Sequence, residues 1–291
     1  MNLLIFNRAT FALLIAAAFS LLAGCNSVPR PPSHQYVPEP NQTADMFPRP
    51  ATRADKTKPA LFIVGDSTVH NAAPEFKGWA DVIAAHFDTN RITIENHARP
   101  GRSSRTFQTQ GWWKIILDRA RPGDFVVIQM GHNDASPVVD TNRARGTLPG
   151  IGDESKTIYN PVTRKSETVH TYGWYLRKYI ADARAKGMMP ILCSPVPRLP
   201  KQNVTDGMTE TNRYAEWSRE VAGDANVAFV DLNRLIMNRY VGMTPAEIKA
   251  SYYTTLDSTH SNLKGAELNA ECFVEGLRKL TSCSLKEFFW N

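Results

Sequence analysis

Five short apolar runs, rich in β-branched residues, constrain the fold of this chain more than any other feature. They occupy residues 61–64, 92–94, 125–129, 190–193 and 227–230, and Gly, Pro, Asn or Asp lies close to each of them. Because the runs are largely continuous in apolar residues instead of alternating regularly with polar ones, they predict strands that are buried on both faces.

Helix-like stretches lie between and after these runs, at residues 78–87, 106–120, 170–186, 211–223 and 263–280. The last stretch carries apolar residues at helical spacing, among them Ala266, Ala270 and Leu277. The alternation predicts a three-layer α/β/α domain, in which helices cover both faces of a doubly wound, flavodoxin-like, five-stranded parallel sheet. Such folds bind ligands beyond the carboxyl ends of their strands.

Residues 135–167 interrupt the alternation. They contain several glycines and prolines, show little periodicity and are longer than an ordinary connection. We predict a substrate-facing loop here, and a disordered surface insertion is the alternative.

The N-terminus has the features of an export signal. Residues 1–24 carry one charged side chain, Arg8, and then an apolar run over residues 11–22 that is too short for a lasting membrane span. The run ends on Leu22-Ala23-Gly24-Cys25, which resembles a bacterial lipobox, so Cys25 is predicted to carry a diacylglycerol anchor. A plain secretory signal with an incidental cysteine is the alternative.

The predicted anchor divides the chain into three parts. Residues 1–24 are a lipoprotein signal peptide, the Pro-, Asn- and Thr-rich residues 25–59 a flexible tether, and residues 60–291 one catalytic domain. Asn26, next to the lipidated cysteine, favours the outer membrane, so we expect an exported lipoprotein of the outer membrane or periplasm of a Gram-negative bacterium.

The charge of the chain is mildly basic, with 34 Lys and Arg against 28 Asp and Glu and a net charge of +6 at pH 7. This excess suits an anionic ligand such as an acidic polysaccharide, but ordinary solvated surface lysine and arginine is the simpler explanation and the one we favour. No basic tract or aromatic RNA motif indicates a nucleic-acid partner.

Three cysteines lie in the predicted domain. Cys193 falls in an apolar run and is predicted to be a buried thiol. Cys272 and Cys283 are close in sequence, and the sequence leaves open whether they pair in an oxidising compartment.

The first predicted strand runs directly into Gly65-Asp66-Ser67. This places the Ser67 hydroxyl at the carboxyl end of the sheet, where a nucleophile can meet a ligand. Alone, the tripeptide is also a common turn and helix N-cap.

Near the other end of the domain, Asp257 and His260 are three residues apart, so one short turn brings the carboxylate to the imidazole. Asp257 can then hold Nδ1–H of His260 and leave Nε2 free to accept a proton from Ser67. For this pair alone, a helix-capping aspartate beside a surface histidine is the alternative.

Two further segments are predicted to end at the same rim, where the third strand leads to Asn133 and the second to Gly101. The oxyanion of an acyl transfer needs several converging donors. The backbone N–H groups of Ser67 and Gly101 and the side-chain amide of Asn133 are predicted to supply them.

In order and across the whole predicted domain, these motifs resemble the SGNH (GDSL-like) hydrolases. The resemblance rests on Gly65-Asp66-Ser67, Gly101, Gly131-His132-Asn133-Asp134 and the segment from Asp257 to His260. It implies a serine esterase with Ser67 as nucleophile, His260 as general base and then acid, and Asp257 as its orienter. Gly101 and Asn133 would form the oxyanion hole, and no metal or other cofactor is implied.

Further motifs are similar to the rhamnogalacturonan acetylesterase branch of that family, namely Lys77-Gly78-Trp79, residues 101–107 and Gly265-Ala266-Glu267. This similarity implies removal of O-acetyl groups from an acetylated pectic polysaccharide. Arg99-Pro100 replaces the small residues usual before the Gly101 position, and residues 135–167 are long, so the polysaccharide itself is left open.

Arg102 and Arg105 follow Gly101 and are candidates to bind uronate carboxylates through charge-assisted hydrogen bonds. Bracing of the neighbouring loop is an equally open role for them.

Several other functions stay open. An acetylxylan esterase, a lipase or a thioesterase can share the fold, because specificity lies in loops. A non-catalytic carbohydrate-binding lipoprotein could use tryptophans as stacking platforms, namely Trp79, Trp112, Trp113 and Trp174. A metallophosphoesterase is disfavoured, because no convincing ligand set accompanies Asp66 and His70.

Overall fold

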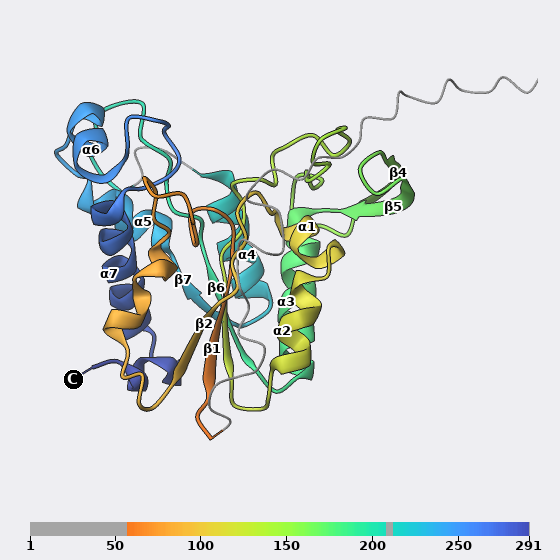
Figure 1. Cartoon of the computed structure of the whole chain (residues 1–291), viewed down its shortest axis with the longest axis horizontal. Helices are drawn as coiled ribbons and strands as arrows, with labels where there is room; N and C mark the ends of the chain where they lie inside the picture. Colours follow the sequence, from red (N-terminus) through yellow and green to blue (C-terminus); the bar gives the residue numbers. More distant parts are fainter. Residues whose placement is uncertain (1–56, 208–211, 291) are drawn as a thin grey trace, which may run out of the picture. The chain divides into compact units, whose positions relative to one another are not determined.

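The computed structural model describes residues 57–207 and 212–290, and a parallel sheet forms its middle layer (Figure 1). The strands are β1 (Ala60–Val64), β2 (Thr93–Asn96), β3 (Phe125–Ile128), β6 (Met189–Cys193) and β7 (Ala228–Val230). They lie in the order β2-β1-β3-β6-β7, and each neighbouring pair is parallel. The predicted fold class is therefore confirmed.

Both faces of the sheet are buried, as the continuous apolar runs predict. In β1, Leu61 and Ile63 join one apolar cluster, while Phe62 and Val64 join the other, and all four are 0% exposed. Successive side chains of a strand point to opposite faces, so a strand between two helical layers must be apolar at every position.

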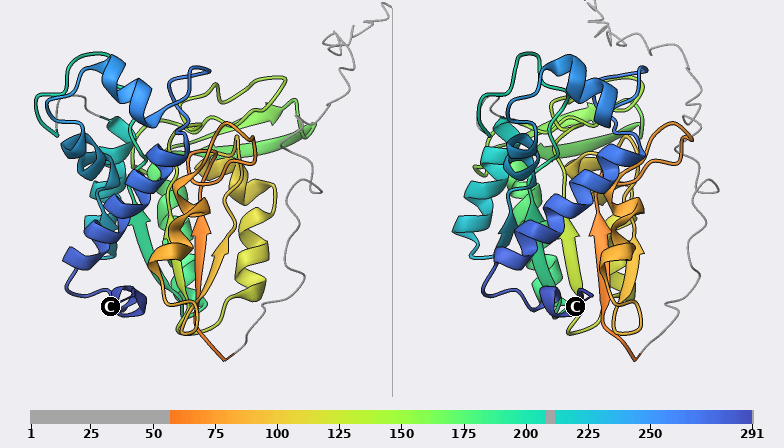
Figure 2. Two further views of the ribbon diagram at one scale, coloured as in Figure 1. Left: turned by 60° about the vertical axis from the view of Figure 1, so that its left-hand side comes forward. Right: turned by 90° about the vertical axis from the view of Figure 1, so that its left-hand side faces the viewer.

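Two groups of helices cover the two faces (Figure 1). The first cluster contains residues from η3 (Trp79–Asp81), η4 (Ile83–His86), α5 (Leu232–Arg239), α6 (Pro245–Tyr252), α7 (Leu263–Lys279) and η5 (Ser284–Phe288). The second contains residues from α1 (Ser104–Thr109), α2 (Trp112–Arg119), α3 (Tyr172–Ala185) and α4 (Arg213–Asp224). In the right-hand view of Figure 2, α7, in dark blue, runs diagonally across the sheet.

The helices differ from the sequence prediction in three places. The stretch 106–120 forms two helices, because Gly111 adopts a left-handed φ of +82° between α1 and α2. The stretch 78–87 forms two short 3-10 helices instead of one α-helix. Helices α5 and α6 were not predicted.

The long segment 135–167 contains the start of an antiparallel hairpin that was not predicted, formed by β4 (Ser155–Asn160) and β5 (Lys165–His170). Its turn begins at Asn160, whose side-chain oxygen accepts hydrogen bonds from the backbone N–H groups of Val162 and Thr163. The hairpin projects from the carboxyl side of the main sheet (Figure 1).

Cys193, Cys272 and Cys283 are free and buried, so Cys272 and Cys283 are not paired in this structure. Among the helices of residues 57–207 and 212–290, none has the length and apolar character that a membrane crossing requires. The predicted signal peptide, the lipid-bearing Cys25 and the tether up to residue 56 lie outside the described residues and stay predictions.

Candidate active site

Ser67 lies on a tight turn directly after β1. The turn starts with Gly65, where a Cβ atom would lie 2.3 Å from Cγ2 of Val69, so no larger residue fits without rearrangement. The backbone N–H of Val69 donates to the carbonyl oxygen of Asp66 at 3.1 Å. The buried Asp66 carboxylate accepts hydrogen bonds from the backbone N (2.9 Å) and Oγ1 (2.8 Å) of Thr68. These contacts hold the Ser67 hydroxyl at the carboxyl end of the sheet.

The segment before α7 brings His260 to Ser67. Nε2 of His260 lies 2.8 Å from Oγ of Ser67, although the two residues are 193 positions apart in the chain. Nδ1 of His260 lies 2.5 Å from Oδ2 of Asp257. The three side chains therefore form one continuous hydrogen-bonded row, as the sequence predicts, in which the imidazole can accept the serine proton.

The Asp257 carboxylate is fixed by its own turn. Its Oδ1 accepts hydrogen bonds from the backbone N–H groups of Thr259 (2.8 Å) and His260 (2.9 Å). Burial acts to raise the pKa of Asp257, but the hydrogen bonds from His260 and Thr259 outweigh it, and the pKa lies below its ordinary value. The residue is therefore a carboxylate at neutral pH, opposite Nδ1 of the imidazole.

Three hydrogen-bond donors predicted for an oxyanion hole line the same cavity. Ser67, Gly101 and Asn133 all contribute to its wall. Within residues 57–207 and 212–290, the backbone N–H groups of Ser67 and Gly101 have no hydrogen-bond acceptor. Nδ2 of Asn133 donates one hydrogen bond to the carbonyl oxygen of Arg102 at 2.8 Å, which leaves it one hydrogen for a ligand. Gly101 is suited to its position by a left-handed φ of +75°.

The cavity has a volume of about 350 Å³ and is open to solvent on one side. Its apolar wall is small and comes from Ala73, Phe76 and Pro100. The ring of Phe76 lies 5.0 Å from that of His260. The cavity is thus a shallow polar cleft around the Ser67 hydroxyl.

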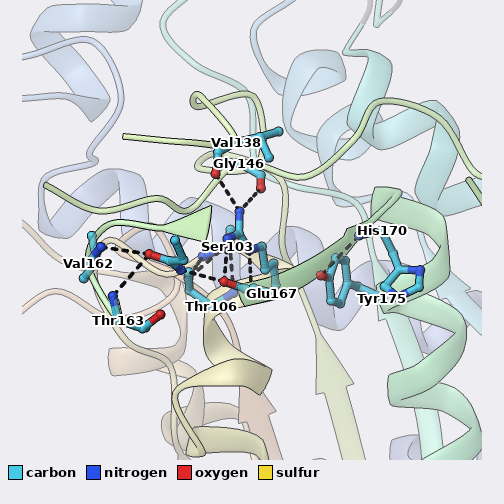
Figure 3. A network of polar contacts seen from close by, with 11 residues as sticks. Ser103, Thr106, Val138, Gly146, Val162, Thr163, Glu167, His170 and Tyr175 are labelled. Atoms are coloured by element: carbon cyan, nitrogen blue, oxygen red, sulfur yellow. Dashed lines mark hydrogen bonds and ion pairs between the residues drawn. The ribbon is translucent and has the colours of Figure 1, made fainter. Parts of the chain in front are cut away.

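Arg105 does not reach this cavity, which corrects the prediction that it binds substrate. It is 0% exposed, and its guanidinium forms two 2.7 Å hydrogen bonds to the Glu167 carboxylate. It also donates to the carbonyl oxygens of Val138 (2.9 Å) and Gly146 (2.8 Å), and Figure 3 shows these two residues and Glu167 within one network of polar contacts. Arg105 therefore braces the 138–146 loop against the hairpin, the alternative that the sequence left open.

Arg102 is also held away from the cavity. It is 5% exposed, and it donates to the side chain of Gln110 (3.0 Å) and the carbonyl oxygen of Pro100 (2.9 Å). Its guanidinium lies 5.7 Å from the ring of Trp112. Arg102 contributes only to a smaller pocket next to the active-site cavity.

Three other arginines line the active-site cavity and were not predicted from the sequence, namely Arg143, Arg145 and Arg198. Two of them belong to the segment 135–167, which the sequence did assign to the substrate. The two arginines that flank Ala144 were the one sequence feature that could have indicated this part of the site.

The geometry does not support two of the alternatives, a non-catalytic protein that stacks carbohydrate on tryptophans and a metallophosphoesterase. Trp79 and Trp113 are buried in the two cores at 0% and 3% exposure. Trp112 packs against arginines and Trp174 stacks on His170, and neither lines the cavity. In the part of the chain that the structure describes, no group of three or more His, Cys, Asp or Glu is placed to hold a metal ion.

Comparisons with known proteins agree with this geometry. A rhamnogalacturonan acetylesterase of Emericella nidulans is 32% identical over 218 residues, which are 75% of this chain and 84% of that protein. A probable rhamnogalacturonan acetylesterase of Bacillus subtilis is 30% identical over 229 residues, 76% of this chain and 93% of the relative. Among solved structures, the YxiM protein of Bacillus subtilis superimposes with a TM-score of 0.60 at 23% identity, over 76% of this chain and 56% of that one.

The match to a known family covers most of the described domain. Residues 63–268 match the GDSL-like lipase/acylhydrolase family. This range contains Ser67, Gly101, Asn133, Asp257 and His260. The predicted family and its similarity to rhamnogalacturonan acetylesterases are confirmed: the chain belongs to the GDSL-like lipase/acylhydrolase (SGNH) family and is an ester hydrolase.

Proposed function

We propose that this protein is a serine esterase that removes O-acetyl groups from an acetylated pectic polysaccharide of the rhamnogalacturonan type. The observation that carries the mechanism is the row of contacts from Asp257 through His260 to Ser67, at 2.5 Å and 2.8 Å. The names of the relatives that are 30% and 32% identical support the acetyl ester and the pectic polymer.

The first step is acylation of Ser67. As Oγ attacks the acetyl carbonyl carbon, its proton passes to Nε2 of His260, and the Asp257 carboxylate stabilises the imidazolium that forms. The carbonyl oxygen becomes an oxyanion, which accepts hydrogen bonds from the backbone N–H groups of Ser67 and Gly101 and from Nδ2 of Asn133. One such donor contributes about 3 kcal/mol of transition-state stabilisation.

The second half of the reaction regenerates the enzyme. When the tetrahedral intermediate collapses, the bond to the sugar oxygen breaks and His260 gives its proton to that oxygen. A water molecule then attacks the acetyl-serine and loses a proton to Nε2. Collapse of this second intermediate releases acetic acid and returns the proton to Oγ of Ser67.

The shape of the cavity favours a short acyl group over a long one. A lipase or thioesterase needs an apolar channel for its acyl chain. Here the apolar wall consists of three residues, and apart from Gly101 the other lining residues have polar or charged side chains, three of them arginines. An acetylxylan esterase is the competing carbohydrate esterase, because it transfers the same acetyl group from a sugar hydroxyl.

The test is acetate release from acetylated rhamnogalacturonan and acetylated xylan by the purified protein and its Ser67→Ala variant. We expect the pectic polymer to be the better substrate, with release abolished in the variant. Release from xylan alone would keep the serine mechanism and refute the polymer. Release that persists in Ser67→Ala would refute the mechanism.

We also propose, from sequence alone, that the protein is exported and anchored to a bacterial membrane through Cys25. The test is mass spectrometry of the N-terminal peptide after membrane extraction. A diacylglyceryl group on Cys25 is the expected result, and an unmodified thiol there would refute the anchor.

A further inference from the structure

The cavity around Ser67 is positively charged to a degree that the acyl-transfer reaction does not require. Arg143, Arg145 and Arg198 all contribute to its wall, while Asp257 is the only acidic residue among its lining residues and is engaged by His260. The ester and the acetyl group are neutral in the bound substrate, and the oxyanion that forms from them already has three hydrogen-bond donors, so the two steps derived above do not need three cations. Their charge indicates that the substrate carries an anionic group outside the ester.

Arg145 lies beside the proposed oxyanion hole. Its Nη1 donates to the carbonyl oxygen of Gly101 at 3.2 Å and its Nε to Oγ of Ser136 at 3.0 Å. Both acceptors are neutral, and Arg145 makes no ion pair with any residue of 57–207 or 212–290. Burial and the positive charge of Arg143 lower the pKa of Arg145, and together they outweigh the carboxylates of Asp140, Asp66 and Asp134, which act to raise it. A nearby anion would relieve both effects.

Arg198 lies on the other side of the reacting serine. Its guanidinium donates to the hydroxyl of Thr259, next to His260, and to the carbonyl oxygen of His132 at 3.2 Å. These acceptors are again neutral, and no ion pair of Arg198 is present among the described residues. Arg145 is therefore held in place by the segment that contains Gly101, and Arg198 by the segment that contains Thr259 and His260.

The loop that carries Arg143 and Arg145 has a fixed conformation. The Asp140 carboxylate accepts hydrogen bonds from the backbone N–H groups of Asn142, Arg143 and Ala144. Ala144 is 0% exposed and adopts a left-handed φ of 42°, which is uncommon for a residue other than glycine. The buried Arg105 contacts described above tie down the same loop at residues 138 and 146. The arginines are thus presented on a supported loop.

We propose that Arg145 and Arg198, with Arg143 beside them, bind a carboxylate of the substrate chain next to the acetylated sugar, and so select uronate-containing polymers. This inference rests on the proposed function, because it assigns the specificity of the same site. Guanidinium groups bind carboxylates through paired, charge-assisted hydrogen bonds, which gives them geometric selectivity that a lysine lacks. Arg145 and Arg198 thereby take the role that the sequence assigned to Arg102 and Arg105.

The experiment compares two forms of one acetylated uronate-containing oligosaccharide, one with free carboxylates and one with methyl-esterified carboxylates. The measured quantity is the ratio of kcat/KM for acetate release from the two forms, which we call the charge preference. The variants are Arg145→Gln, Arg145→Lys and Arg198→Gln. Arg278→Gln is the matched control, because Arg278 is exposed near the end of α7, remote in the fold from the Ser67 turn.

We expect the wild-type protein and Arg278→Gln to have a kcat/KM at least about tenfold higher on the free-acid form than on the methyl ester. A factor of about ten corresponds to the lower end of what a hydrogen bond to a charged group contributes. Each glutamine variant should lower the charge preference about tenfold, and Arg145→Lys should lower it less. Raising the ionic strength should reduce the wild-type preference, because the cleft is open to solvent.

Two results would overturn this inference while leaving the esterase standing. One is Ser67-dependent acetate release with no charge preference in the wild-type protein. The other is an equal loss of kcat/KM on both forms in Arg145→Gln and Arg198→Gln, which would show that these arginines only support Gly101 and Thr259. If neither form gives Ser67-dependent acetate, the proposed function itself fails, and the subsite fails with it.

Discussion

Replacing Asp257 by asparagine tests which nitrogen of His260 carries the proton. An asparagine has the shape of the aspartate, so its side-chain oxygen can still accept the backbone N–H bonds of Thr259 and His260. Its NH2 group would then face Nδ1 of His260 at the position of Oδ2, 2.5 Å away. Nδ1 must become an acceptor, which moves the proton to Nε2, opposite the Ser67 hydroxyl. The serine then faces a donor and cannot transfer its proton.

We expect kcat of Asp257→Asn to fall about 10⁴-fold, which is about 5.5 kcal/mol of activation free energy, with a much smaller change in KM. The assay is steady-state acetate release from pH 6 to 9, with unfolding in urea as a check on stability. Asp257→Ala is the control for the turn, because it loses the side-chain oxygen that accepts both backbone N–H bonds and should also destabilise the fold. A kcat of Asp257→Asn within tenfold of wild type would refute the proposed tautomer and the role of Asp257.

Two further predictions concern stability. Arg105→Met leaves the partly buried Glu167 carboxylate without its guanidinium partner, with only the hydrogen bond from Asn160 remaining among the described residues, and should lower the free energy of unfolding by about 3 kcal/mol in urea denaturation, the lower end of the range for a broken buried pair. The double variant Arg105→Met/Glu167→Met should recover part of the loss, and a single variant as stable as wild type would contradict the bracing role. Burial raises the pKa of Asp134 from 3.8 to about 7 despite hydrogen bonds from Ser104, so between these values the folded protein holds a proton that the unfolded chain has lost. The stability from this group is therefore complete below about pH 4 and is lost as the pH rises through 7. Asp134→Asn should lose less stability between pH 5 and pH 8 than the wild-type protein, and equal losses would contradict the assignment.

The sheet was predictable because its signal is local and strong. Each strand that is covered on both faces must be apolar at every position, and β1 and β3 fulfil this with no exception. The hairpin gave no such signal, because most side chains of β4 are exposed and only Ile158 and Asn160 are buried. Its strands are held by backbone pairing and by the ion pair between the buried Arg105 and Glu167, neither of which can be read from hydrophobic periodicity.

The same difference between local sequence signals and contacts with distant residues explains which residues of the site could be predicted. Ser67 and the Asp257–His260 pair were predictable, because Ser67 directly follows the first strand and a three-residue interval brings Asp257 to His260. Arg145 belongs to no motif, and its place in the cavity depends on contacts of the loop with distant residues. Arg105 was one candidate for substrate binding because it is close to Gly101 along the chain, but it does not line the cavity. The start of α1 at Ser104 turns Arg105 away from the cavity and into the loop.

The distance along the chain between Ser67 and His260 has a consequence for when this protein becomes active. At a synthesis rate of roughly 5–20 residues per second, a ribosome needs on the order of 10–40 s to travel the 193 residues between them. During that time the nascent chain already contains its nucleophile but has no base to activate it. Hydrolysis therefore begins only when the residues just before α7 have docked against the turn after the first strand, so esterase activity reports that the two ends of the domain have come together.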